Sequence, residues 1–419
     1  MSITLLAATP GAPVPAGRGR WRVQLLKRSF SYYNWSQNVI AELNCRSRRL
    51  EQAWNSSATF SFTIDGRSPE AASIAELQQD VMVWRWDEAT GGDVCMFRGI
   101  IAQAVDQVTE QSHTINITCH DYLAMLARRI ITRPLSYVQT DQDTIAVALM
   151  LAATNSTASD GTAFNPGSYL PLTPALVNPA GQTRPQSGVL RDRNYTASSV
   201  ISEQLDNLAT VLGGFDYDVL PAPTASMADD ALRIFYPYQG VLRSSPVLMY
   251  GTTVSGVTRT VNSGDFTNYW RSLGNNGSED PDTPQLYAEA WDPSVNNVTV
   301  VPIGLWMSTD DEPDVTLQQT LIDKANGNLN MSSVLVPSYA LTLRPNAYSY
   351  GNPNMGDTVP LIIQSGRINV NSNVRVLGIT FDVGDDGEED ISLTVGRPDI
   401  TFSDLLIGPV RDVNALSRR

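Results

Sequence analysis

Short runs that alternate apolar and polar residues dominate the first third of the chain. In the clearest run, Ile115, Ile117 and Cys119 alternate with polar neighbours, which puts one face of a strand in a core and the other in water. Asp65-Gly66 and Gly91-Gly92-Asp93 are turn signals between runs. Six short strands in about 100 residues predict a small β-barrel or sandwich. The predicted strands are Trp21–Lys27, Val39–Cys45, Thr59–Ile64, Val81–Trp86, Met96–Val105 and His113–His120.

The middle of the chain changes to a helical period. Over Ser198–Leu212, four apolar residues fall on one stripe, and Gly213-Gly214 ends the pattern. Thr154–Arg193 has almost no periodicity and is rich in Gly, Pro, Ser, Thr and Asn, which predicts a long loop or insertion. Further helices are predicted over Tyr122–Ile131, from Asp141 through the apolar stretch Ile145–Ala153, and over Val315–Ala325, which Asn326-Gly327 should end. Further strands are predicted at Phe215–Leu220 and Ala231–Tyr236 as a hairpin, and within Met249–Asn262 and Phe266–Leu273.

The C-terminal part returns to alternating runs and contains a weak internal repeat. The residues from Gly99 to Asp121 resemble those from Gly378 to Asp399, and each hairpin follows a strand opened by an aspartate, Asp80 or Asp357. One interpretation is that antiparallel hairpins in general look alike. The sharper one is two copies of one small barrel, from which a threefold oligomer could close a ring with six similar contacts. The strands predicted here are Tyr339–Leu343, Thr358–Ile363, Asn373–Val383 and Ile391–Val395, with a turn at Gly384-Asp385-Asp386-Gly387.

Composition excludes several classes of protein. With 29 Lys+Arg against 43 Asp+Glu, the net charge is −14, which disfavours recognition of nucleic acid. An apolar content of 42% is too high for a disordered chain. No apolar run is long enough to span a bilayer, and the proline-broken N-terminus lacks the basic region of a secretory signal.

The residue types that carry chemistry are sparse, so no catalytic, cofactor-binding or metal-binding residue is predicted. Cys45, Cys95 and Cys119 form no Cys-x-x-Cys pair, and adjacent Cys119 and His120 point to opposite faces of a strand. His113 is the other histidine, and no nucleophile elbow or phosphate loop occurs. Three acidic clusters lie in predicted turns and are interpreted as solvated loop charges: Glu279–Asp282, Asp310–Glu312 and Asp385–Asp390.

The tryptophans are interpreted first as packing residues of cores or subunit interfaces. Trp84 and Trp86 lie two apart and share one face of a strand. Tyr348 and Tyr350, beside Gly351, are candidates for contact with a neighbouring protein. Stacking on a host sugar is the alternative role for the aromatic residues. The other tryptophans are Trp21, Trp35, Trp54, Trp270, Trp291 and Trp306.

Several longer motifs extend over most of the chain, from about Trp21 to Asp399. They are FRGII with TINITCHDYLAMLARR, LGGFDYDV, LMYGTTVSGVTRTVNSGDFTNYWRSLG, and YALTLRPNAYSYGNPNMGDTVPL with RVLGITFDVGDDGEEDISLTVGRPD. None is specific alone, but their order and spacing together resemble the tail-hub, or baseplate-hub, proteins of long-tailed bacteriophages. The greatest similarity is to the minor tail proteins of phages of actinobacteria.

The resemblance implies a structural role in the virion and no catalytic residue. It implies a homotrimer whose paired barrels form a pseudo-sixfold ring between the sixfold tail tube and the threefold tip. The implied partners are the distal tail protein ring, the C-terminus of the tape-measure protein and downstream tip or fibre proteins. DNA would meet the protein only in transit through the ring, and the protein would occupy the host cytoplasm during assembly.

The predicted fold class is mainly β, with two hub-type barrels at the two ends and two α+β regions inserted between them. The alternative function is a tail-tip protein that binds host cell-surface glycans or degrades the cell wall, with its chemistry in Thr154–Arg193 or Asn275–Glu312. The predicted domains are an N-terminal arm over 1–20, a first barrel over 21–130, a helical and loop-rich domain over 131–214, an α+β domain over 215–335, a second barrel over 336–403 and a tail over 404–419.

Overall fold

The computed structural model divides the chain into two compact units. Described residues of Met1–Thr258 and Ala340–Pro398 form the larger unit, and those of Arg259–Tyr339 form the smaller one. The structure describes residues 21–28, 38–87, 91–154, 170–210, 213–221, 230–264, 266–274, 285–292, 304–311, 318–333, 335, 337–345, 347–349 and 351–396.

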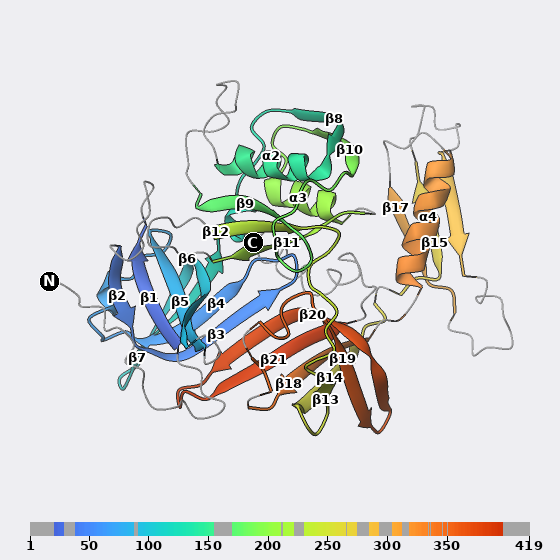
Figure 1. The fold of residues 1–419 in the computed structure, drawn as a ribbon. Helices are drawn as coiled ribbons and strands as arrows, with labels where there is room; N and C mark the ends of the chain where they lie inside the picture. Colours follow the sequence, from blue (N-terminus) through green and yellow to red (C-terminus); the bar gives the residue numbers. More distant parts are fainter. Residues whose placement is uncertain are drawn as a thin grey trace. The chain divides into compact units, whose positions relative to one another are not determined.

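Strands make up most of the described structure (Figure 1). The strands of the N-terminal part are β1 Trp21–Lys27, β2 Val39–Leu43, β3 Cys45–Ala53, β4 Thr59–Asp65, β5 Gln79–Asp87, β6 Gly92–Val108 and β7 His113–Asp121. Those of the middle part are β8 Leu135–Asp141, β9 Leu172–Val177, β10 Leu190–Tyr195, β11 Asp216–Leu220 and β12 Asp230–Phe235. The remainder are β13 Leu248–Met249, β14 Val254–Val261, β15 Tyr269–Leu273, β16 Tyr287–Trp291, β17 Met307–Asp311, β18 Pro337–Leu343, β19 Thr358–Ser365, β20 Ile368–Val383 and β21 Glu389–Gly396. The α-helices are α1 Leu123–Leu126, α2 Gln142–Thr154, α3 Ile201–Ala209 and α4 Gln318–Ser332.

The predicted N-terminal strands are present, and a further strand, β3, was missed. The run predicted as Val39–Cys45 breaks at Asn44, and β3 begins at Cys45. The alternation in β3 is hidden by charge, because only Cys45 and Leu50 are buried, while Arg46, Arg49 and Glu51 are exposed. β3 is nevertheless an interior strand, paired with β4 on one side and with β20 on the other. Its stability therefore comes from its ladders rather than from an apolar face.

The large sheet consists of two sets of strands with the same order. In the N-terminal set the order is β3-β4-β7-β6-β5, and in the C-terminal set it is β14-β18-β21-β20-β19. Each set therefore follows one topology, in which a strand pair precedes a three-strand meander that folds back beside it. No pairing among the described residues closes either set into a barrel.

The strand ladders correct the alignment of the internal repeat. The β6–β7 ladder has a bulge between Ile101 and Gln103, and the β20–β21 ladder has one between Val376 and Gly378. Aligning the two bulges places Gln103, not Gly99, at the position of Gly378, so the alignment based on the two glycines is wrong by four residues. The two glycines are not equivalent, and they meet different neighbours: Gly99 lies against the His120 carbonyl and Gly378 against the Thr394 side chain.

The two sets are joined by main-chain pairing. β20 pairs antiparallel with β3 over Gly378–Val383, and Arg49 forms an ion pair of 2.8 Å with Asp382 across this joint. Beside it, the buried carboxylate of Glu389 accepts hydrogen bonds from the Trp21 indole at 2.9 Å and from Arg85 at 2.8 Å. The sets are thus one continuous sheet within the chain, connected by a strand ladder and a buried ion pair.

The middle domain lies between the two sets in sequence and has its own core. β12 pairs parallel with β9 and antiparallel with β11, which confirms the hairpin predicted over residues 215–236. α2 and α3 pack on this sheet through one apolar cluster, and the predicted domain boundary at 214/215 falls inside that cluster. The prediction of a long loop over Thr154–Arg193 is wrong for β9 and β10, whose prolines and polar residues mask them in the sequence.

The first predicted helix is shorter than its sequence pattern suggested. α1 ends at Leu126, and Ile130 is 48% exposed instead of lying on a helix face. Ile131 is buried in its place, and its amide donates to Ser199 O at 2.8 Å. Pairing with the segment before α3 therefore replaces the last turns of the predicted helix.

The smaller unit is a three-stranded sheet covered on one face by α4 (Figure 1). Its order is β16-β15-β17, and Ala288 and Ala290 of β16 pack against Leu321, Ala325 and Leu329 of the helix. The prediction that Asn326-Gly327 ends the helix is wrong, because α4 continues to Ser332. Burial of Leu329 beyond the glycine offsets the roughly 1 kcal/mol that glycine costs inside a helix.

Candidate functional site

The thiols of the three cysteines and the carboxylate of Asp121 are buried in the structure. All three cysteines are buried, and burial raises the pKa of each thiol, to about 12 for Cys45. Burial also raises the pKa of Asp121 to about 6, but its carboxylate accepts hydrogen bonds from Ser57, Ala58 N and Leu123 N. These groups face neighbouring backbone rather than an open cleft. The hydrogen bonds of Asp121 link the end of β7 to the residues before β4 and to the start of α1.

Among the described residues, no three His, Cys, Asp or Glu side chains gather closely enough to hold a metal ion. In the same part of the chain, no helix combines the length and apolar character needed to cross a bilayer.

The interpretation of the acidic clusters as solvated loop charges is wrong for two residues. Asp310 accepts hydrogen bonds at 2.6 Å from both the Trp270 indole and the Ser272 hydroxyl. Glu389 is the buried partner of Arg85 at the joint between the two strand sets. The cluster Glu279–Asp282 and Glu312 lie outside the described residues. Local turn preference could not reveal these long-range partners.

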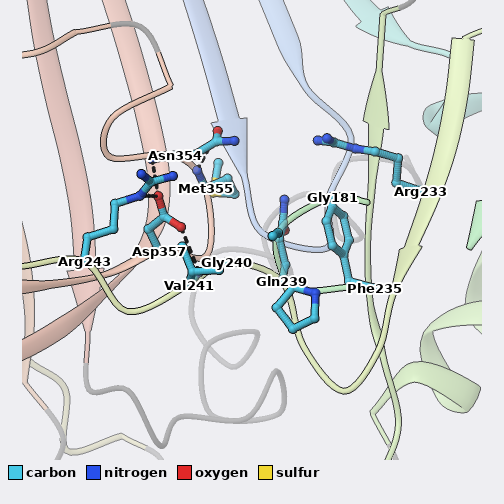
Figure 2. A pocket seen from close by; sticks show the side chains of 12 residues that line it. Gly181, Arg233, Phe235, Gln239, Gly240, Val241, Arg243, Asn354, Met355 and Asp357 are labelled. Atoms are coloured by element: carbon cyan, nitrogen blue, oxygen red, sulfur yellow. Dashed lines mark hydrogen bonds and ion pairs between the residues drawn. The ribbon is translucent and has the colours of Figure 1, made fainter. Parts of the chain in front are cut away.

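One pocket of about 80 Å³ lies beside the start of β19 (Figure 2). Its two arginines are already paired, Arg233 with Asp218 at 2.6 Å and Arg243 with Asp357. Two glycines make the backbone crossing beside it possible, because a Cβ on Gly240 would lie 2.0 Å from the carbonyl carbon of Gly356. The space suits a few water molecules rather than a sugar or nucleotide, so we assign the pocket a structural role.

Two buried arginines connect the strand sets to the middle domain. Arg98 of β6 forms an ion pair of 3.3 Å with Asp230 of β12, and both side chains are 0% exposed. Arg375 of β20 donates to Asp216 of β11 at 2.6 Å and lies 4.5 Å from the Trp54 ring centroid. Each set therefore contributes one arginine to the same three-stranded sheet. We call these two contacts the arginine clamps.

The clamps could not be read from the sequence, because arginine on a β-strand ordinarily faces water. The opening aspartates of the predicted repeat are also buried, and each pairs with an arginine. Asp80 binds Arg28 at 3.0 Å, and Asp357 binds Arg243. Of the four buried carboxylates, the sequence pointed to two, Asp80 and Asp357, as the aspartates that open the strands of the repeat.

The face of the smaller sheet opposite α4 carries exposed aromatic residues. Trp291 is 53% exposed and lies with its ring 6.5 Å from that of Tyr269 at an interplanar angle of 16°. On the same face, Arg271 lies over the ring of Tyr287 at 4.3 Å and within 3.8 Å of Glu289. We call this surface the aromatic face. It combines flat apolar rings with charged groups able to form hydrogen bonds.

The predicted tryptophan roles divide between core and surface. Trp21 and Trp54 are buried, and Trp84 packs beside Leu26 and Met82, as expected for packing residues. Trp291 and Trp306 are exposed. Tyr348 lies against Phe381 with ring centroids 5.7 Å apart, whereas Tyr350 and Trp35 lie outside the described residues.

The fold is that of solved phage tail proteins. No protein-family model and no curated protein matches the chain. The 43 kDa tail protein of prophage MuSo2 from Shewanella oneidensis is similar with a TM-score of 0.58 at 12% identity, covering 91% of this chain and 99% of that one. The tail protein from Neisseria meningitidis MC58 is similar with a TM-score of 0.57 at 12% identity, covering 92% and 98%.

A further similarity is to a chain of the half-lidded PdpA–VgrG complex of Francisella. Its TM-score is 0.50 at 8% identity, and the match covers 93% of this chain and 60% of that one. At these identities the likeness establishes a common fold. The two tail proteins share it over nearly their whole length, so the chain as a whole has the architecture of a phage tail protein.

Proposed function

We propose that the protein is a non-enzymatic structural hub at the distal end of a phage tail. The observation that carries this proposal is the pair of strand sets with one topology, joined through β3 and β20 in a chain that has the fold of two phage tail proteins. Two like halves per chain suit a junction between rings of different symmetry. The sequence resemblance to tail hubs, and its finer similarity to minor tail proteins of actinobacterial phages, points the same way.

In this proposal three chains form a ring of six similar sets, each set folded as a small barrel. The ring adjoins the distal tail protein ring on one side and the threefold tip or fibre proteins on the other. The C-terminus of the tape-measure protein and then the DNA pass through its centre. The domains over 21–130 and 336–403 form the ring together with β14, and the other segments between them contribute the inserted domains.

The charge of the chain fits a role as a conduit. A net charge of −14 repels DNA phosphates, so DNA would slide past rather than bind. We propose that the ring lumen is acidic. A basic lumen in the assembled ring would contradict this part of the proposal.

Light scattering on the purified chain tests the ring. The expected result is a species of three times the chain mass at high concentration, because the ring closes only when three identical chains contribute two sets each. Incubation of the same sample with peptidoglycan is expected to release no fragments. Release of fragments would instead support the degradation of cell wall.

A second candidate function, the binding of host glycans, is favoured by the aromatic face. Sugar rings stack on exposed flat aromatic side chains, and Trp291 and Tyr269 present such rings beside the ion-pairing Arg271 and Glu289. This face lies within the part of the chain, 275–312, in which the alternative function was predicted, together with β15. It is compatible with the hub role, because a tip protein can both build a ring and touch the host.

The substitution Trp291→Ala tests glycan binding. We expect it to weaken binding of soluble cell-wall glycan fragments by about tenfold, through loss of the ring that stacks on the sugar. Tyr250→Ala is the matched control, since Tyr250 is also an exposed aromatic residue but belongs to a turn of the larger unit. The measurement is isothermal titration calorimetry. Equal affinity of wild type, variant and control for the glycan, or no binding by any of them, would contradict a glycan-binding function of the aromatic face.

A further inference from the structure

The outer half of β6 is exposed at the position where its counterpart in β20 is covered. Aligning the bulges places Gln103–Val108 of β6 at the position of Gly378–Val383 of β20. In β20 this segment lies between β21 and β3, and its apolar residues are buried. In β6 the described structure gives it β7 alone, and Val108, the counterpart of the buried Val383, is 69% exposed. One edge of β6 is therefore open where the equivalent edge of β20 is filled.

The strand equivalent to β3 is also at an open edge. β14 occupies in the C-terminal set the place that β3 occupies in the N-terminal set, and the path of the sheet ends at β14 among the described residues. An exposed strand edge presents unpaired N–H and C=O groups that favour pairing with another strand. The internal joint pairs β20 with β3. The chain leaves open the edge of the counterpart of each of these strands, which is β6 for β20 and β14 for β3.

The geometry points to a second copy of this chain as the partner. We propose that residues 103–108 of β6 in one copy pair antiparallel with β14 of the next copy, as β20 pairs with β3 within the chain. This proposal rests on the proposed function, because it supplies the contact that would close the ring. The two edges carry opposite charges, since Asp106, which also contacts His113 at 2.9 Å, is the charged residue of the β6 segment and Arg259 is that of β14.

The contact is head-to-tail rather than isologous, and three chains would close it into a ring. Each copy offers its β6 edge to one neighbour and its β14 edge to the other, and such interfaces build rings or filaments. Internal β3–β20 joints would alternate with intermolecular β6–β14 joints around the ring. The ring would then contain twice as many similar joints as chains.

The open edge of β6 can be blocked without disturbing the β6–β7 ladder. The Thr109 amide donates to Ser112 O at 2.8 Å, on the β7 side. Main-chain N–H groups alternate sides along a strand, so those of residues 105 and 107 also face β7, while those of 104, 106 and 108 face the open edge. Proline at position 104 removes an outward N–H and is tolerated at a strand edge.

The test compares Ala104→Pro with Ala104→Ser, which keeps the N–H at the same position. Light scattering measures the mass of each variant as a function of concentration. Hydrogen exchange measures the protection of backbone amides in the wild-type peptides 101–110 and 253–262. We expect wild type and Ala104→Ser to associate, Ala104→Pro to need at least tenfold more protein to do so, and exchange in both peptides to slow as wild type associates. A circular-dichroism melt checks that Ala104→Pro folds.

Other outcomes separate this inference from the proposed function. Association of Ala104→Pro equal to wild type, with no change of exchange in the two peptides, would overturn the β6–β14 contact and leave a ring built through another surface. A wild-type chain that remains monomeric at its highest soluble concentration would overturn the ring itself. If Ala104→Pro fails to fold, the exchange of the two wild-type peptides decides the question alone.

Discussion

Replacing Asp230 by asparagine is expected to lower the free energy of unfolding by about 3–5 kcal/mol, because it leaves the guanidinium of Arg98 buried without its carboxylate. Both side chains of this clamp are 0% exposed, and the Arg98 guanidinium lies 5.2 Å from the ring centroid of Tyr122. Water cannot reach the charge to replace the lost partner. The measurement is the denaturant midpoint and slope of the larger unit, followed by fluorescence.

The control for this clamp is Asp218→Asn in the same three-stranded sheet. Asp218 also pairs with an arginine, Arg233, at 2.6 Å, but the two side chains are 19% and 17% exposed. Partial hydration should limit its loss to about 1 kcal/mol. Replacing both members of the clamp by apolar residues, as Arg98→Met with Asp230→Leu, should recover much of the loss, because no charge is then buried. Equal losses for Asp230→Asn and Asp218→Asn would contradict the importance of burial.

A methyl group at Gly99 is expected to destabilise the protein by about 3 kcal/mol or more, at the upper end of the cost of overpacking. The Cβ of an alanine there would lie 2.1 Å from the His120 carbonyl oxygen and 2.6 Å from the Phe97 ring. A backbone oxygen in the β6–β7 ladder cannot move aside without breaking hydrogen bonds. The thermal midpoint of Gly99→Ala is the measurement.

Gly378→Ala is the matched control, since it replaces the glycine that the sequence comparison treated as equivalent. Its Cβ would lie 3.3 Å from Thr394 Cβ and 3.4 Å from Gln52 O, a contact that small shifts can relieve. We expect a loss below about 1 kcal/mol. Equal losses of stability in the two variants would contradict the assignment of the Gly99 effect to the close approach of the His120 carbonyl oxygen.

Much of the local structure was predictable because it depends on neighbours in sequence. β1 spans the predicted residues, and α3 lies within the predicted Ser198–Leu212 and buries Ile201, Leu205 and Leu208 of its stripe, while Leu212 lies outside the described residues. The turn at Gly384–Gly387 joins β20 to β21. Alternation and helical spacing are set by the chain geometry itself, so a single sequence carries them. The mainly β class followed from counting such segments.

The failures have one cause, which is that a distant partner changed the local outcome. α1 ends early because Ile131 bonds to Ser199, and α4 passes Gly327 because Leu329 packs on a sheet. β3 was missed because its stability comes from β4 and β20. The spacing of apolar residues within α1, α4 or β3 does not indicate which distant segment each of these elements will contact.

For function, the order of motifs in the sequence resembled tail hubs, and the solved tail proteins share the fold at 12% identity. Identity that low preserves the path of the chain more than its residues. This is why the architecture, rather than any catalytic group, carries the functional proposal.

Alternation and helical spacing along the chain were enough to predict the strand-rich class and the position of most elements, and they indicated two similar halves as one interpretation of the repeat. The strand ladders and long-range contacts were needed to show which residues of those halves correspond, that β3 pairs with β20, and that Arg98 and Arg375 are buried in clamps. The apolar and polar pattern of a segment predicts which of its residues face a core and which face water. The register of a strand pair and the partner of a buried charge depend instead on a segment that is distant in the sequence.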